Sequence, residues 1–389
     1  MPLFVLLLPR RVEALAPECT GTALSWLLLI GGLVAGLANV AAGALGDRWI
    51  VRFGSRRGLI AIGAGLLASA YAAFTFADTL PKLFAALIFF QLSLNCCFSP
   101  LGALLADHFN DAVKGRLGGL LTAALPTSSL LVLPIAWLFP EDSSGAFLLI
   151  GGMILVCMLP LLTIWSLGSV INTPSTVIAA GAKRVTEEPA KASLFVDFAL
   201  AWLSRLLIQT GAAFVIGYIY LYITVMQLSE REWRSAGASE ILAELTAPAA
   251  ILAIAGTLFA GFLSDRIKSR RIPLAVFAVF FAVGMGTLAT STNLVLFFIG
   301  YGVLQAALAA YLSVDTALIA QLVSGHARRG FLLGVLNLSN TAPSVIVPSI
   351  ALVAFADNAI PSILALMFAG FAFAAFAAGA LIMMIRGIR

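Results

Sequence analysis

The stretch GALGDR at Gly43–Arg48 recurs as GFLSDR at Gly261–Arg266. An arginine pair follows each copy, Arg56 with Arg57 and Arg270 with Arg271. The aspartates of the two copies, Asp47 and Asp265, lie 218 positions apart in a chain of 389 residues. A basic motif that returns after about half of the chain, each time between two apolar segments, indicates two equivalent halves.

The composition places this chain in a membrane. Hydrophobic residues make up 61% of the chain and charged residues 11%, and the mean hydropathy is +1.05. The apolar residues gather in runs of roughly 20, the length of a helix that crosses a bilayer. Backbone polar groups in hydrocarbon must be satisfied within the segment, so we expect helices. The sequence therefore predicts an all-α polytopic membrane protein with eleven full spans, near residues 23–45, 58–77, 83–106, 117–139, 146–167, 203–227, 244–263, 272–291, 294–320, 331–354 and 362–385.

Basic residues are distributed unevenly between the loops on the two sides of these segments. Of the 23 Lys and Arg, only five fall opposite the repeated motif: Arg10, Arg11, Lys82, Arg231 and Arg234. The positive-inside rule then predicts that both copies of the motif, the linker and the C-terminus are cytoplasmic. We expect the protein in the cytoplasmic (inner) membrane. The net charge of +5 therefore sets orientation, and we expect no nucleic-acid partner.

The predicted spans suggest twelve helices in a six-plus-six plan. Residues 168–192 are polar and are predicted to form a cytoplasmic linker between an N-terminal half, 1–167, and a C-terminal half, 193–389. The stretch MPLFVLLLP at Met1–Pro9 is too short to span a bilayer. We interpret it as the outer part of a truncated helix 1. The four cysteines and two histidines have no disulfide or metal-ligand spacing, so we expect no metal. The sequence also has no nucleophile elbow, glycine-rich phosphate loop or zinc signature, so we expect no cofactor and no enzyme activity.

These motifs resemble those of the major facilitator superfamily. Gly43–Arg48 with Gly54–Arg57 is similar to its signature between helices 2 and 3, with two extra residues between Trp49 and Arg52, and Ser264–Pro273 is similar to the counterpart between helices 8 and 9. The pattern Asp-Arg, Arg-Arg-x-Pro resembles the sugar–cation branch, which includes sucrose–proton symporters. Further similarities to that branch are Leu94-Asn95 before Ser99-Pro100, Val314–Leu318, and Arg329-Gly330 before Leu333–Asn337.

The resemblance implies a monomeric carrier that works by alternating access, with a central cavity lined by helices 1, 4, 7 and 10. It also implies that Asp47 stabilises one state at the positive N-terminus of helix 11, as a helix dipole would allow. The residues expected to act as conformational latches, and not as solute ligands, are Gly43, Asp47, Arg48, Arg56, Arg57, Asp265, Arg266, Arg270 and Arg271. Ordinary solvation in a loop is the alternative for Asp47 and Arg48.

One face of predicted helix 10 carries Tyr301, Leu308, Tyr311 and Asp315. A charged aspartate within a span costs about 2.5–3.5 kcal/mol on insertion scales, so it should face protein or water. Asp315 is therefore our candidate for coupling transport to a proton or another cation, with Tyr311 one turn away as a hydrogen-bond partner. The alternative is a structural carboxylate near the cytoplasmic gate.

Further polar residues in predicted spans 4 and 7 are candidates for the cavity. Gln91, Asn95 and Ser99 form a stripe at helical spacing, which suits a hydroxyl-rich solute or, alternatively, contacts between helices. In helix 7, Gln209 shares a face with Arg205, for which a salt bridge is favoured over binding an anionic solute. Tyr218, Tyr220 and Tyr222 are expected in an interfacial aromatic belt.

Taken together, these residues favour a secondary transporter that imports a small, polar, sugar-like solute with protons. The 27 phenylalanines keep a second hypothesis open, an efflux carrier for amphipathic compounds. A third hypothesis is a receptor or assembly protein without transport activity on the same fold. Fold analogy alone does not decide between them.

Overall fold

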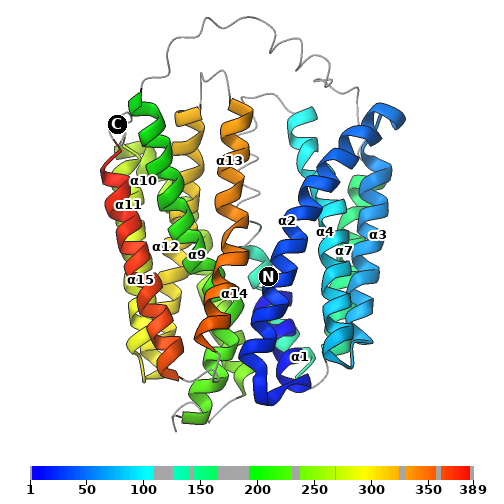
Figure 1. Cartoon of the computed structure of the whole chain (residues 1–389), viewed down its shortest axis with the longest axis horizontal. Coiled ribbons are helices and arrows are strands. Elements are labelled where there is room, and N and C mark those ends of the chain that lie inside the picture. Colours follow the sequence, from blue (N-terminus) through cyan, green and yellow to red (C-terminus); the bar gives the residue numbers. More distant parts are fainter. Residues whose placement is uncertain are drawn as a thin grey trace, which may run out of the picture. The chain divides into compact units, whose positions relative to one another are not determined.

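A computed structural model describes residues 2–108, 124, 126–140, 143–164, 192–229, 237–267, 269–323, 329–355 and 361–385. All regular secondary structure in these residues is helical (Figure 1). Except for Ala192, the predicted linker lies outside the described residues, and so do 117–123 and 125 of the predicted span 117–139.

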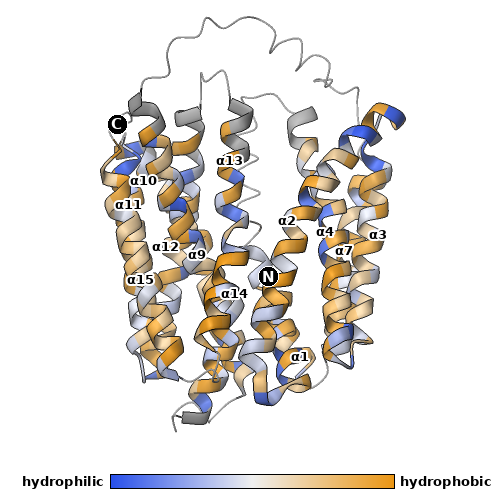
Figure 2. Ribbon diagram, viewed as in Figure 1, coloured by the Kyte–Doolittle hydropathy of each residue, from blue (hydrophilic) through white to orange (hydrophobic). Residues whose placement is uncertain are grey.

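Ten helices in the described part of the chain are long and apolar enough to cross a membrane. Hydrophobic residues run along them (Figure 2), and large apolar side chains such as Val353, Leu366 and Phe373 stay exposed, as expected where the solvent is lipid. The predicted polytopic helical fold is therefore confirmed. The long helices are α2 (Thr20–Phe53), α3 (Arg57–Thr75), α4 (Leu80–His108), α7 (Ser143–Thr163), α9 (Ala192–Ser229), α10 (Ala238–Ile267), α11 (Arg271–Thr290), α12 (Leu294–Val323), α13 (Arg329–Thr341) with α14 (Pro343–Ala354), and α15 (Pro361–Met383).

Shorter helical pieces complete the chain. A π-helix at Leu3–Leu7 (η1) continues into α1 (Leu8–Leu15), and a 3₁₀ turn at Pro17–Cys19 (η2) leads into α2. The described part of predicted span 117–139 contains α6 (Val132–Leu138) within an apolar helical stretch, Pro126–Leu138.

The repeated motif lies in helices and not in loops, which corrects our prediction. Asp47 and Arg48 lie in the last turns of α2, and Asp265 and Arg266 end α10. Nothing in either motif breaks a helix, because glycine and arginine are tolerated there and the first strong stop signal comes later. In the first copy that stop is Gly54, which has a φ of 67° and donates its N–H to the carbonyl of Ile50, as a C-terminal cap does.

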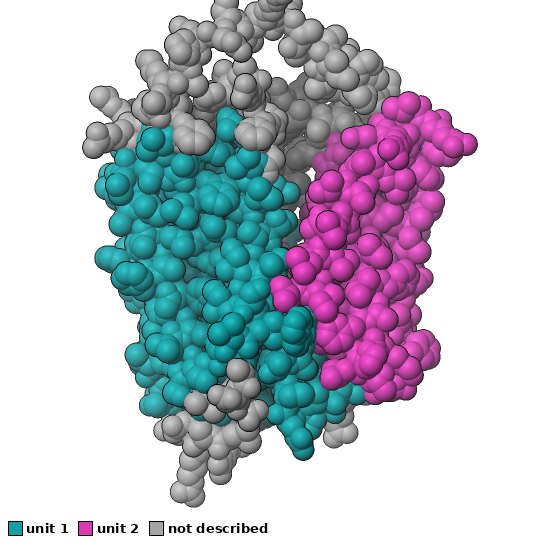
Figure 3. Space-filling view, viewed as in Figure 1, with its two compact units in different colours: residues 1–26, 119–137, 187–389 teal, residues 27–118, 138–186 magenta. Residues whose placement is uncertain are grey.

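The described residues form two compact units (Figure 3). Unit 1 contains 1–26, 119–137 and 187–389, and unit 2 contains 27–118 and 138–186. The two compact units are defined by contacts between residues, whereas our predicted halves are defined by the repeated motif in the sequence. The division into 1–167 and 193–389 therefore stays a prediction.

In unit 2, α3 packs against both α4 and α7. The ring of Phe74 stacks on that of Phe147 from α7 at 5.1 Å, and Tyr71 meets Phe90 of α4 edge to face. Gly63 of α3 allows the closest approach, because a Cβ there would lie 2.6 Å from the Cα of Cys97. Small residues at such crossings are the usual means by which membrane helices pack closely.

In unit 1, α12 packs against α10 and α11, and α15 packs against α11 and α9. Glycines again mark the crossings, with Gly256 against the carbonyl of Ala306 and Gly284 against Leu304. The span formed by α13 and α14 is interrupted at Ala342, immediately before Pro343. A kink is expected there because proline cannot continue the hydrogen bonds of a helix.

The tyrosines of α9 face the protein interior and do not form the interfacial belt that we expected. Tyr218, Tyr220 and Tyr222 are at most 4% exposed. Tyr218 donates to the Ser25 hydroxyl at 2.8 Å, and Tyr220 donates to the Glu13 carboxylate at 2.7 Å. Both partners belong to the N-terminal segment of unit 1, so these phenols fasten that segment to α9. A belt position requires lipid contact, which α9 lacks here because it is the most buried of the long helices.

Candidate functional site

A buried ion pair joins α9 and α12 within unit 1. The guanidinium of Arg205 donates through Nη1 to Oδ2 of Asp315. The Asp315 side chain is fully buried and that of Arg205 is 9% exposed. The second carboxylate oxygen, Oδ1, has no hydrogen-bond partner among the described residues. Among the described residues, this buried oxygen therefore lacks the hydrogen bond that buried polar atoms normally make.

Asn340, in the last turn of α13, holds the same arginine from the other side. Its Oδ1 accepts from Arg205 Nε at 3.1 Å and Nη2 at 3.0 Å, and from Gln209 Nε2 at 3.1 Å. A second bond fastens α13 to α9, because the indole of Trp202 donates to the Val335 carbonyl at 2.8 Å. These contacts fix the guanidinium against Asp315.

The expected hydrogen bond between Tyr311 and Asp315 is absent from the described contacts. Tyr311 is buried, and its hydroxyl lies 2.9 Å from the hydroxyl of Ser204. Ser204 in turn donates to the Ala378 carbonyl of α15 at 2.9 Å. Tyr311 lies one helical turn from Asp315, but its phenol is hydrogen-bonded to Ser204 of α9.

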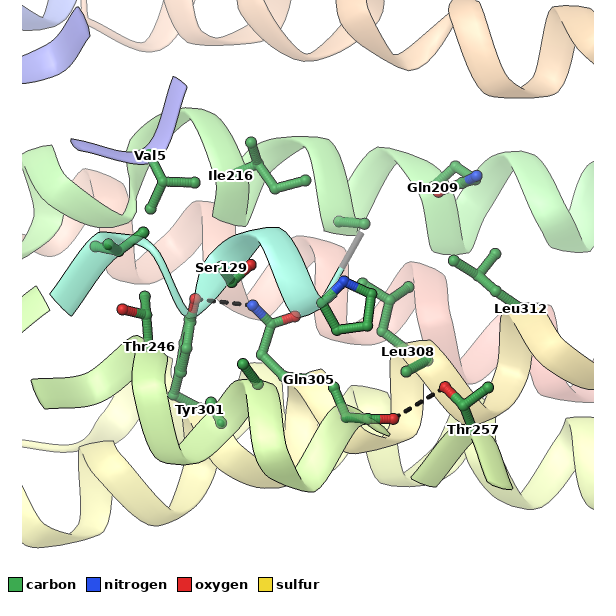
Figure 4. Close-up of a pocket in the computed structure, with 17 residues that line it drawn as sticks. Val5, Ser129, Gln209, Ile216, Thr246, Thr257, Tyr301, Gln305, Leu308 and Leu312 are labelled. Carbon is green, nitrogen blue, oxygen red and sulfur yellow. Dashed lines mark hydrogen bonds between the residues drawn. The ribbon is translucent and has the colours of Figure 1, made fainter. Parts of the chain in front are cut away.

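A pocket opens beside this network, also within unit 1 (Figure 4). Its empty space is about 850 Å³ when the open mouth is included. Alanines and other apolar residues form most of its wall. The uncharged polar side chains in the lining are Ser129, Gln209, Thr246, Thr257, Tyr301 and Gln305.

Several of these polar groups are already engaged by protein. Gln305 donates through Nε2 to the Tyr301 hydroxyl at 2.8 Å (Figure 4), and Thr246 and Thr257 donate to carbonyls of their own helix. The phenolic proton of Tyr301 and the Gln305 carbonyl therefore remain as a donor and an acceptor that a solute could meet. The lining contains no charged side chain among the described residues, so it suits an uncharged molecule.

Gln209 belongs to both the pocket and the network. It lines the pocket, and its amide donates to Asn340, which accepts from Arg205. Of the residues that we predicted from the sequence, the structure brings Gln209, Tyr301 and Leu308 together in the pocket wall. Arg205 and Asp315 lie in the network beyond Gln209, and Tyr311 packs in the core.

The predicted polar stripe of α4 belongs to unit 2. Asn95 accepts from Asn39 Nδ2 of α2 at 3.1 Å and donates to the Gln91 carbonyl at 2.9 Å. A Cβ at Gly43 would lie 3.7 Å from the Ser99 hydroxyl. The stripe thus faces α2 and makes a contact between helices, and a role in solute binding stays a prediction.

The motif residues also make contacts within their own units. In unit 2, Arg56 is buried and lies 3.4 Å from the largely exposed Asp47. In unit 1, Arg271 donates to the carbonyl of Ile385, Arg270 is the N-cap residue of α11, and Arg266 lies over the Phe262 ring. The Asp265 side chain lies outside the described residues. The latch role of these residues stays a prediction.

Three residues that contribute to the site were not identified from the sequence: Asn340, Gln305 and Ser204. Asn340 lies one turn after Asn337, another asparagine of the same apolar span, and Gln305 lies one turn from Tyr301 on the same helix. Ser204 carries no such signal, because a serine in a membrane helix most often bonds its own backbone.

The chain matches the family model described as Major Facilitator Superfamily over residues 13–348. Among solved structures it is similar to a bacterial homologue of the human lysosomal transporter Spinster, in an inward-facing and unoccupied conformation. The identity is 14%, the TM-score is 0.63, and the match covers 99% of this chain and 93% of that one. No curated protein matches the sequence.

Proposed function

The chain belongs to the major facilitator superfamily, and from this premise we propose that it is a secondary active transporter for a small uncharged solute, coupled to protons through Asp315. The observation that carries the proposal is the continuity between an uncharged pocket and a buried ion pair, joined by Gln209 and Asn340. We propose uptake by alternating access in the cytoplasmic membrane.

The solute class follows from the chemistry of the lining. A charged solute would leave its charge unpaired in a site whose described residues offer only amides, hydroxyls and apolar surface. A molecule with a few hydroxyl groups can instead use the Tyr301 phenol and the amides of Gln209 and Gln305. These properties support a neutral, sugar-like solute.

The coupling role rests on the cost of buried charge. A proton-coupled carrier needs a group that is charged in one state and neutral in another. Asp315 is fully buried, and its Oδ1 has no hydrogen-bond partner in the part of the chain that the structure describes. A proton on Oδ1 would remove the buried negative charge and weaken the attraction to Arg205. The arginine would then depend on Asn340, which also holds Gln209 of the pocket.

Transport in proteoliposomes tests this proposal. We expect wild-type protein to concentrate at least one of sucrose, maltose or glucose under an imposed inward proton gradient. Asp315→Asn keeps the shape but cannot titrate, so it should abolish accumulation and preserve exchange of the same sugar across the membrane. If Asp315→Asn still concentrates the sugar, coupling through Asp315 is wrong.

A matched pair of pocket variants separates solute binding from coupling. Tyr301→Phe removes a donor from the lining and should raise the half-saturating solute concentration about tenfold, because an unmade hydrogen bond costs on the order of 1 kcal/mol or more. Tyr71→Phe removes a buried phenol of unit 2 that does not line the pocket. This control should leave the half-saturating solute concentration unchanged. Equal effects of the two variants would contradict our choice of pocket.

Efflux of amphipathic compounds is the second candidate. The observation in its favour is the wall of alanines and other apolar residues, which offers dispersion contacts and few directional bonds. The same vesicles distinguish the two functions. Proton-driven movement of a neutral amphipathic dye with no transport of any tested sugar would favour efflux.

A further inference from the structure

The first copy of the repeated motif has an additional helical turn that the second copy lacks. Nine positions separate Asp47 from Arg56, but only five separate Asp265 from Arg270. Accordingly α2 continues beyond Asp47 to Phe53, whereas α10 ends at Ile267, two residues after its aspartate. The end of α2 beyond Arg48 thus carries Trp49 and, in the additional turn, Phe53.

This end of α2 forms one wall of a second pocket, which lies entirely in unit 2. The lining includes Trp49 and Phe53 of α2, Ser55 in the connection that follows, and Arg57 and Gly58 at the start of α3. Leu162 near the end of α7 completes the wall. The empty space, with its open mouth, is about 730 Å³. Three candidate spans end here, so the pocket lies where the protein leaves the hydrocarbon.

The polar groups of this pocket are hydrogen-bond donors. The Trp49 Nε1 group is buried and has no acceptor among the described residues. Ser55 Oγ already accepts the backbone N–H of Arg57 at 3.2 Å, which leaves its hydroxyl proton to donate. The Arg57 guanidinium adds a positive charge, and the lining contains no acidic side chain among the described residues. An acceptor-rich anion matches this set.

The surroundings add charge and an apolar platform. Four arginines and one aspartate lie between Asp47 and Arg57, and the aspartate faces Arg56, so the stretch carries a net charge of +3. The centroids of the Trp49 and Phe53 rings lie 4.4 Å apart. Phe53 is 56% exposed, and Leu162 in the pocket wall is half-buried. Basic pockets between helix ends at a membrane surface, with tryptophan beside them, suit a phospholipid headgroup.

We propose that Trp49, Ser55 and Arg57 bind the phosphate of an anionic phospholipid, whose acyl chains lie along Phe53 and Leu162. The second copy of the motif provides an internal comparison. There Ile267 takes the place of Trp49, and Arg271, the counterpart of Arg57, donates to the Ile385 carbonyl at the end of α15. The buried indole donor of Trp49 is therefore specific to the first copy.

Native mass spectrometry of the delipidated full chain tests the proposal. Phosphatidylglycerol, phosphatidylcholine and inorganic phosphate are titrated separately, and the bound species are counted. We expect one tight phosphatidylglycerol adduct and weak binding of the other two. Equal binding of both lipids would overturn the proposal. Tight binding of inorganic phosphate with no preference for phosphatidylglycerol would show that the site binds free phosphate and not a lipid headgroup.

Four variants locate the adduct. Arg57→Gln should weaken phosphatidylglycerol binding about tenfold, as expected for a lost charge-assisted hydrogen bond. Arg57→Lys should retain most of the binding, which would show that the fold tolerates a substitution at this position. Trp49→Phe keeps the ring and should weaken binding severalfold. Arg48→Gln removes a charge of the same cluster outside the pocket and should change binding by less than about twofold. If Arg48→Gln and Arg57→Gln have the same effect, binding is diffuse and the pocket is not the site.

Discussion

At the residue scale, the pair of Arg205 and Asp315 makes a prediction about stability. Removing one partner of a buried ion pair leaves the other charge uncompensated and typically costs about 3–5 kcal/mol, whereas removing both is often close to neutral. Arg205→Gln should therefore lower the melting temperature in detergent micelles, and the double variant with Asp315→Asn should recover most of the loss. A double variant no more stable than Arg205→Gln would contradict the pairing.

The same scale shows what a sequence can reveal about a site inside a membrane. Arg205, Gln209, Tyr301 and Asp315 could be predicted because polar side chains in apolar helices are costly and therefore conspicuous. Their partners could not, because Arg205 meets Asp315 across 110 positions and only tertiary packing decides that contact. Asn340 was missed for the same reason, since nothing in its own helix marks it as the acceptor of three bonds.

At the scale of elements, Gly284 and Gly286 of α11 form a matched pair. A Cβ at Gly284 would lie 2.7 Å from Leu304 Cβ and 2.9 Å from the Gly300 carbonyl of α12, whereas a Cβ at Gly286 would meet nothing within 4 Å. Gly284→Ala should force the two helices apart and cost about 1–3 kcal/mol. Gly286→Ala should leave stability unchanged or raise it by up to about 1 kcal/mol. Thermal unfolding in micelles measures both, and a loss at Gly286 as large as at Gly284 would contradict this packing.

Helix existence was predictable, and helix ends were not. Runs of apolar residues located the spans because hydrocarbon demands them, but α9 begins at Ala192, well before the predicted start near 203. Its first turns contain Asp197, which is buried in the protein and so does not need to lie outside the bilayer. In α2 the motif looked like a loop because it is charged, yet charge at a helix end is compatible with helix.

At the scale of the whole molecule, the asymmetry of basic residues makes a prediction about orientation. The turn after α10 carries a basic cluster and is predicted to be cytoplasmic, whereas Cys19 in η2 is exposed and is predicted to lie on the outer side. Two proteins with a single cysteine test this in intact cells. One retains Cys19 and replaces Cys96, Cys97 and Cys157, and the other replaces all four and carries Ser269→Cys.

An impermeant maleimide should label the Cys19 protein in intact cells and the Ser269→Cys protein only after the membrane is opened. The physical reason is that lysine and arginine near the ends of spans resist translocation, so the side rich in them stays inside. The Cys19 protein controls for reagent access and expression in the same cells. Labelling of Ser269→Cys from outside would invert the topology, and it would also move the proposed lipid site of α2, α3 and α7 to the outer leaflet, because α2 and α10 end in copies of one motif.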